Sequence, residues 1–202
     1  IKAALLILLI SGFVISIINP PYPEQTHLQH FVTYIAFIIL AYDVFRSFFS
    51  LTAFSFLTIF ISLHIIGARW IYSMVPYDDW FVYLFNWSPD QYFDWSRNQY
   101  YRFVHLAFGI LFFPAFFELF KKKTRIPISY IAIFTFLIIQ FFSLLYELFE
   151  WSLTLLLSET DAANYNGQQG DIWDAHKDMA LAMLGSGIVL IIYLFWRRKA
   201  VE

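Results

Sequence analysis

Long apolar runs separated by short polar segments are the main pattern of the sequence. Runs of roughly 18 or more residues with few charges are typical of transmembrane helices. We predict six such helices, over roughly residues 1–18, 28–48, 51–75, 101–120, 126–157 and 174–196. Prolines follow the first and third runs, and three lysines follow the fourth. The predicted fold is therefore all-α, a single transmembrane domain with residues 1–48 as scaffold and residues 51–199 carrying a site.

Composition supports a membrane protein and excludes several other classes. Hydrophobic residues make up 60% of the 202 residues and charged residues 14%. The absence of cysteine excludes disulfides and thiolate metal sites. The net charge of −2, without a basic block, argues against nucleic-acid binding. The first apolar run could be a signal peptide, but no small-residue cleavage pattern follows it, so we interpret it as a retained helix.

Basic residues are distributed unevenly between the two sides of the predicted bundle. Nine of the 13 lie on one side if both termini are there: Lys2, Arg46, Lys121, Lys122, Lys123, Arg125, Arg197, Arg198 and Lys199. Cytoplasmic segments carry such an excess, so we predict that both termini are cytoplasmic. On the outer side, the aromatic segment 76–100 is expected to lie along the lipid headgroups. The alternative is that this segment forms a lid over a site.

Polar side chains that lipid-facing helices avoid occur in and before the last four predicted helices. They are His64, Arg69 and Tyr72; Arg97, Asn98, Arg102 and His105; Tyr146, Glu147 and Glu150; and Asp171, Asp174 and Asp178. If the last helix begins near Asp171, its three aspartates share one face. At about 1.5 Å of rise per residue, all these groups fall near the outer third of the bilayer. We therefore expect them to converge on one pocket.

Carboxylates at that depth need compensation. One solution is a structural network of ion pairs with Arg69, Arg97, Arg102 and Lys177, and a second is protonation. The third is a divalent cation held by Glu147, Glu150, Asp174 and Asp178, together with His64 or His105. Oxygen ligands suit Mg²⁺, Ca²⁺ or Mn²⁺, and added imidazole suits Mn²⁺, Fe²⁺ or Zn²⁺. No dedicated metal motif decides between these solutions, and a lone His64 on an apolar helix is more often a hydrogen-bonded core residue.

Four stretches of these helices resemble the YjdF-type inner-membrane protein family, a family of unknown function, and more distantly the VanZ-like membrane proteins. The stretches are His64-Ile65-Ile66-Gly67-Ala68 with Tyr72 and Pro76; Arg97-Asn98-x-Tyr100-x-Arg102-x-x-His105; Tyr146-Glu147-x-x-Glu150-Trp151; and Gln169-Gly170-Asp171-x-Trp173-Asp174-x-x-x-Asp178-Met179. The family pattern has an acidic residue where this chain has Tyr101. The resemblance implies a multi-pass protein of the bacterial inner membrane, and VanZ-like proteins are linked to resistance to lipoglycopeptide antibiotics. It names no reaction.

The leading functional hypothesis is a membrane-embedded hydrolase or transferase that acts on a phosphate or ester of a lipid or lipid-linked substrate. Metal ligands would be Glu147, Glu150, Asp174, Asp178 and His64. Catalytic residues would be Asp171 and His105, and substrate would be bound by Arg69, Arg102, Tyr72 and Tyr146. The expected partners are membrane lipids and a lipid-linked substrate. Two alternatives stay open: a protein that binds or moves lipids or glycopeptides without catalysis, and a structural accessory protein.

Overall fold

A computed structural model describes residues 1–156, 158, 162, 165–166 and 169–199. The described residues form helices joined by turns, without strands. The helices are α1 (Lys2–Ile17), α2 (Pro23–Gln29), α3 (Phe31–Arg46), α4 (Leu51–Arg69), α5 (Tyr77–Phe85), α6 (Pro89–Tyr92), α7 (Tyr100–Leu111), α8 (Phe113–Lys123), α9 (Ile128–Leu156) and α11 (Asp174–Lys199). The predicted all-α fold is confirmed for this part of the chain.

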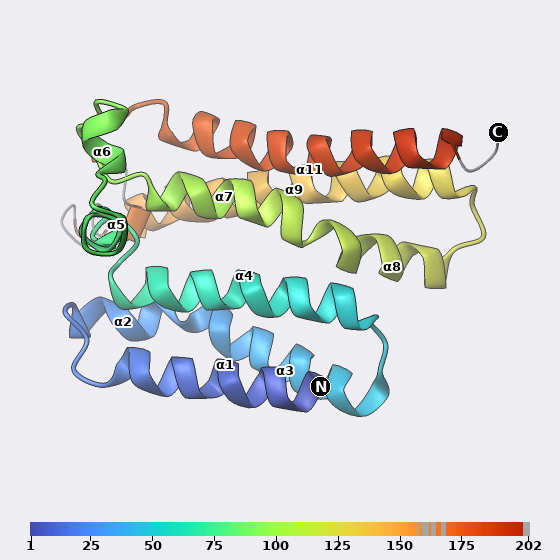
Figure 1. Cartoon of the computed structure of the whole chain (residues 1–202), viewed down its shortest axis with the longest axis horizontal. Helices are drawn as coiled ribbons and strands as arrows, with labels where there is room; N and C mark the ends of the chain where they lie inside the picture. Colours follow the sequence, from blue (N-terminus) through green and yellow to red (C-terminus); the bar gives the residue numbers. More distant parts are fainter. Residues whose placement is uncertain (157, 159–161, 163–164, 167–168, 200–202) are drawn as a thin grey trace.

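The long helices form two layers (Figure 1). The helices α1, α3 and α4 pack together in one layer, and α7, α9 and α11 pack together in the other. The layers meet mainly where α4 packs against α7 and α8. Figure 1 also shows that α1 begins and α11 ends toward one end of the bundle, whereas α5 and α6 lie at the other. The start of α7, the start of α11 and the end of α9 therefore lie together at the end that carries α5.

Among the described residues, five helical stretches are long and apolar enough to cross a membrane, so the predicted count of six is not confirmed. They are Pro23–Arg46, Leu51–Arg69, Tyr100–Lys123, Ile128–Leu156 and Asp174–Phe195. The helix α1 is apolar but has only 16 residues. At about 1.5 Å per residue it is shorter than a hydrocarbon core roughly 30 Å thick.

Two predicted helices differ from the structure for local reasons. The helix α4 ends at Arg69, six residues before the predicted Val75, because Ile71 and Tyr72 have φ values of 47° and 54°. The predicted fourth helix is divided at Phe112, one residue before α8, which carries a proline in its first turn. The last helix begins at Asp174, as predicted, so Asp171 lies in the preceding turn and not on the helix face that it was expected to share with Asp174 and Asp178. The predicted end of the fifth helix, residue 157, lies outside the described residues.

The helix α5 lies across the bundle and presents apolar side chains outward. Figure 1 shows α5 end-on, whereas the long helices lie in the plane of the picture, along its horizontal axis. None of its residues is buried, and Tyr83 is 88% exposed. Amphipathic aromatic side chains in this orientation are typical of helices in the headgroup region, which is where the sequence predicts this segment. That location, and the alternative of a lid, stay predictions.

Two glycines bring α7 and α11 into close backbone contact. A Cβ atom on Gly109 would lie 2.2 Å from the carbonyl oxygen of Ala182, and one on Gly185 would lie 2.4 Å from that of Leu106. Small residues at helix crossings in membranes permit this approach. Because Gly109 is one turn after His105 in the sequence, the crossing sets how closely the polar groups of α7 approach those of α11.

Candidate functional site

Three buried side chains from three helices meet near the α5 end of the bundle. His105 is on α7, Glu147 on α9 and Asp178 on α11, and one potential ligand atom from each lies within 4.8 Å of the others. The Nε2 atom of His105 is 3.7 Å from Oε1 of Glu147 and 4.0 Å from Oδ2 of Asp178. Their exposed fractions are 8%, 6% and 1%. We call these residues the triad.

The triad carries polar atoms without hydrogen-bond partners among the described residues. Glu147 Oε1 and Asp178 Oδ1 are buried, and neither accepts a hydrogen bond from that part of the chain. A buried carboxylate oxygen is costly unless it binds a donor, a proton or a cation. One imidazole with two carboxylates is a ligand set that divalent Mn, Fe or Zn ions accept. The triad residues therefore fit a divalent cation.

A second polar cluster lies beside the triad, and it joins three cationic side chains to two aspartates. Asp174, which is 4% exposed, forms ion pairs in which its Oδ1 lies 2.7 Å from Arg97 and 3.6 Å from Arg102. Asp171 Oδ2 lies 2.5 Å from Arg102, 2.6 Å from Lys177 and 3.2 Å from Arg97. We call these five residues the Arg-Asp cluster. It is the ion-pair network that the sequence offered as one solution, but it uses only two of the five carboxylates.

Asp171 is held strongly in its ionised form. Hydrogen bonds from the Lys177 ammonium and the Trp173 backbone N–H lower the pKa of its carboxyl to about 2, and Arg102 acts in the same direction. A carboxylate with so low a pKa is a weak general base at neutral pH. The catalytic role predicted for Asp171 therefore lacks support in its surroundings.

Charge in the whole region does not balance within the described residues. The five carboxylates belong to Asp171, Asp174, Asp178, Glu147 and Glu150. The three cations that pair with the aspartates belong to Arg97, Arg102 and Lys177. With all five acids ionised, the region carries a net charge of −2, because the Arg-Asp cluster sums to +1 and the three carboxylates outside it sum to −3. One divalent cation would cancel this net charge.

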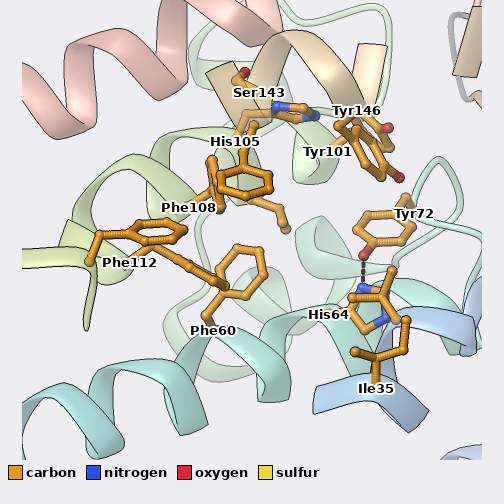
Figure 2. A pocket seen from close by; sticks show the side chains of 14 residues that line it. Ile35, Phe60, His64, Tyr72, Tyr101, His105, Phe108, Phe112, Ser143 and Tyr146 are labelled. Atoms are coloured by element: carbon orange, nitrogen blue, oxygen red, sulfur yellow. Dashed lines mark hydrogen bonds between the residues drawn. The ribbon is translucent and has the colours of Figure 1, made fainter. Parts of the chain in front are cut away.

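An apolar cavity of about 400 Å³ reaches the triad from between the two layers. Aromatic side chains, including Phe60, Phe108 and Phe112, form much of its wall. Figure 2 shows His105, Tyr101 and Tyr146 on one side of the space and His64 with Ile35 on the other. His105 is thus part of both the cavity wall and the triad. A ligand chain inside the cavity would end against the His105 side chain of the triad.

The sequence model of one protein family, described as "Predicted membrane protein (DUF2238)", matches residues 1–199. The chain belongs to this family. No curated protein and no solved structure matches it. Membership of DUF2238 supports a membrane protein with several apolar helices and assigns no reaction. The YjdF-type and VanZ-like resemblances stay predictions.

Arg69 and His64 were predicted for the site of this DUF2238 protein, but neither belongs to the triad or to the Arg-Asp cluster. Arg69 donates hydrogen bonds to the backbone oxygens of Ile15, Ser16 and Ile18 at 3.1, 2.7 and 3.0 Å, so it caps the end of α1. His64 shares a hydrogen bond between its Nδ1 and the Tyr72 hydroxyl, and it is not part of the triad. The core interpretation of His64 therefore fits its contacts, although the ring also lines the cavity.

The remaining predicted residues of this DUF2238 protein take distinct positions. Glu150 accepts a hydrogen bond from the Tyr101 hydroxyl rather than joining the triad. Tyr72 and Tyr146 line the cavity. Burial, followed by the neighbouring Tyr100 and Tyr165 hydroxyls and Glu150, raises the pKa of Tyr72 well above its ordinary value, so its hydroxyl stays protonated.

The structure places here two residues without a site role predicted from the sequence, Tyr101 and Ser143, and a third, Arg97, that was predicted only as a cation of the ion-pair network. Arg97 binds both aspartates of the Arg-Asp cluster. Tyr101 binds Glu150, and Ser143 lines the cavity with a hydroxyl that has no partner among the described residues. Helix spacing in the sequence could have indicated Tyr101 and Ser143. Tyr101 is four residues before His105, and Ser143 is four residues before Glu147, so each shares a helix face with a triad residue.

Proposed function

We propose that this protein is a membrane-embedded, metal-dependent hydrolase or transferase that acts on a phosphate or ester group of a lipid or lipid-linked substrate. The observation that carries the proposal is the double position of His105, in the triad and in the wall of the apolar cavity. An acyl or prenyl chain would occupy the cavity, and the polar group to which it is attached would meet the triad. Cavities of several hundred Å³ with few polar groups are typical of ligand sites.

The metal would be held by His105, Glu147 and Asp178. Of the ligands predicted from sequence, Glu147 and Asp178 are kept, and His105 replaces His64. Three protein ligands leave coordination positions for water and substrate, as in catalytic zinc sites. A divalent cation there would polarise a phosphoryl or ester oxygen and lower the pKa of a bound water. The packed helices around the triad would exclude bulk water.

Metal content tests the proposal. Wild-type protein purified in detergent and incubated with Zn²⁺ or Mn²⁺ is expected to retain about one ion per chain. The isosteric variants Glu147→Gln and Asp178→Asn should each bind the ion at least about tenfold more weakly, because each removes a charged ligand. Glu118→Gln is a matched control, since Glu118 is a carboxylate of α8 that binds Ser50. Elemental analysis after gel filtration gives the stoichiometry.

A folded wild-type protein that retains no metal would overturn the metal-dependent proposal. A cavity lined mostly by apolar side chains also favours the second candidate, a protein that binds or moves lipids without catalysis. That candidate predicts that a lipid copurifies equally with wild type and with Glu147→Gln, and that it is recovered chemically unchanged. The enzyme predicts that the wild type converts a suitable lipid to product and that Glu147→Gln does not.

We further propose that the α5 end faces the outer leaflet and that both termini are cytoplasmic, because Lys121, Lys122 and Lys123 lie at the end of α8, far from α5. The chain has no cysteine, so in each single-cysteine variant any labelling occurs at the introduced thiol. A membrane-impermeant maleimide added to intact cells is expected to label Tyr83→Cys and to leave Lys123→Cys unlabelled until the cells are lysed. The reverse pattern would invert the orientation and place the site in the inner leaflet.

A further inference from the structure

Three cationic side chains converge on a single carboxylate oxygen in the Arg-Asp cluster. Asp171 Oδ2 lies 2.5 Å from Arg102, 2.6 Å from Lys177 and 3.2 Å from Arg97. The three come from the start of α7, the first turn of α11 and the turn before α7. The Asp171 carboxylate supplies one negative charge to three cations, and with Asp174 included the Arg-Asp cluster still carries a net charge of +1.

The two aspartates of this cluster differ in how firmly they are built into the fold. Asp174 begins α11 and is 4% exposed. Asp171 lies outside the helix, with a side chain that is 15% exposed. Its turn is attached to the loop before α7 by Gln169, which accepts from the Asn98 backbone N–H at 3.0 Å and donates to the Asn98 carbonyl at 3.3 Å. The Asp171 carbonyl oxygen accepts from the Asp174 backbone N–H at 3.1 Å. A rotation of the Asp171 side chain would release the three cations and the Trp173 N–H, while this backbone contact to α11 stays in place.

With Asp171 removed, the remaining groups match the recognition chemistry of a phosphate. Guanidinium groups bind phosphate oxygens in pairs, and a lysine adds a mobile point charge. The first turn of α11, a 26-residue helix, adds the positive end of its dipole. Asp174 would then oppose three cations with one charge, leaving two positive charges for a phosphate monoester or diphosphate.

The cluster is also placed correctly for a group attached to a chain in the cavity. Arg102 and His105 are three residues apart on α7, and Asp174 and Asp178 are four apart on α11, so each pair shares a helix face. The cation cluster therefore lies about one helical turn, roughly 5 Å, from the triad. A phosphate bound there would lie next to the proposed metal.

We propose that Asp171 occupies an anion site in the resting protein, and that the phosphate group of a phospholipid or prenyl-phosphate-type substrate replaces it on Arg97, Arg102 and Lys177. The proposal rests on the proposed function only in attributing the phosphate to the substrate. It gives Asp171 the role of an internal competitor, in place of the catalytic role predicted from sequence. It also limits the substrate class to phosphates, excluding neutral esters.

Binding of inorganic phosphate and of farnesyl phosphate tests the proposal, with farnesol as the same chain without the phosphate. Both phosphates should bind Asp171→Asn about tenfold more tightly than wild type, because the asparagine no longer competes with phosphate for the three cations through a negative charge. Farnesol should bind both proteins equally. Lys177→Gln should weaken phosphate binding several-fold, and Asp79→Asn on α5 is the matched control. Calorimetry in detergent at two salt concentrations gives the affinities.

Each outcome decides the question. Equal phosphate affinity of Asp171→Asn and wild type overturns the proposal, as does equal affinity for farnesyl phosphate and farnesol. If Asp171→Asn does not fold, an unchanged phosphate affinity in Lys177→Gln overturns it instead. Tighter binding of farnesyl phosphate alone assigns the site to a lipid headgroup, whereas equal gains for both phosphates assign it to phosphate in general. Metal analysis of the same samples separates the two proposals, since metal without phosphate binding retains only the proposed function.

Discussion

Gly109→Ala is expected to push α7 away from α11 and to abolish metal binding at the triad. The new Cβ atom would lie 2.2 Å from the Ala182 carbonyl oxygen and 2.8 Å from the Ser186 backbone nitrogen. Both are backbone atoms of a continuous helix, so no side-chain rotation relieves the contact. Overpacking of this kind costs about 1–3 kcal/mol, and more where backbone must move. His105 lies on one of the separating helices and Asp178 on the other.

The measurements are thermal unfolding in detergent and zinc content after gel filtration. Gly187→Ala is the matched control on α11, because the nearest atom to its new Cβ is a Phe136 ring carbon at an ordinary 3.9 Å. It should unfold like wild type and retain zinc. Gly185→Ala should behave like Gly109→Ala, since its Cβ would meet the Leu106 carbonyl oxygen at 2.4 Å. Full zinc content in Gly109→Ala would show that the helix crossing does not set the triad geometry.

Arg97→Met is expected to be strongly destabilising, by about 3–5 kcal/mol, as is usual when one partner of a buried ion pair is removed. Arg97 is the closest cation to Asp174, at 2.7 Å, and the Asp174 side chain is only 4% exposed. Without it, the nearest remaining guanidinium of the Arg-Asp cluster is that of Arg102, at 3.6 Å. Methionine keeps much of the apolar volume, so the loss would report mainly on charge.

A double variant and a control separate charge from packing in this prediction. Arg97→Met combined with Asp174→Asn removes both charges and should recover at least half of the lost stability. Lys177→Met should cost less than about 1 kcal/mol, because the Lys177 side chain is 49% exposed and surface pairs contribute little. Thermal unfolding followed by intrinsic tryptophan fluorescence is suitable for all three. If Arg97→Met and Lys177→Met unfold at the same temperature, the buried pair with Asp174 does not stabilise the fold.

Helix positions and the convergence of polar groups could be predicted from the sequence, because both follow from local periodicity and depth. His105, Glu147 and Asp178 were each placed near one level by counting residues along separate helices, and the structure brings them within 4.8 Å. The pairing between helices could not be predicted in this way. It depends on rotation of each helix about its axis, which the apolar pattern of a membrane helix specifies weakly.

The residues that changed roles show this limit. Depth made both His64 and His105 candidate ligands, although a lone His64 is more often a core residue. The packing of α7 and α9 against α11 places His105 beside the carboxylates. Arg69 was expected to meet an anion, yet the short α1 ends near it and takes its hydrogen bonds. Tyr101, which stands where the family pattern has an acidic residue, donates a hydrogen bond to Glu150. Each outcome depends on a contact between segments far apart in the chain.

The crosswise helix α5 has a consequence for how the protein responds to its bilayer. With α5 resting among the headgroups, as we propose, the vertical distance from the lipid surface to the triad is set by the protein itself. A thicker or thinner bilayer must then be accommodated at the opposite end, where Lys121, Lys122 and Lys123 can extend their flexible side chains to reach water. Hydrophobic mismatch would tilt or strain that lysine-bearing end, while substrates of different chain length would still present their headgroups at one constant height.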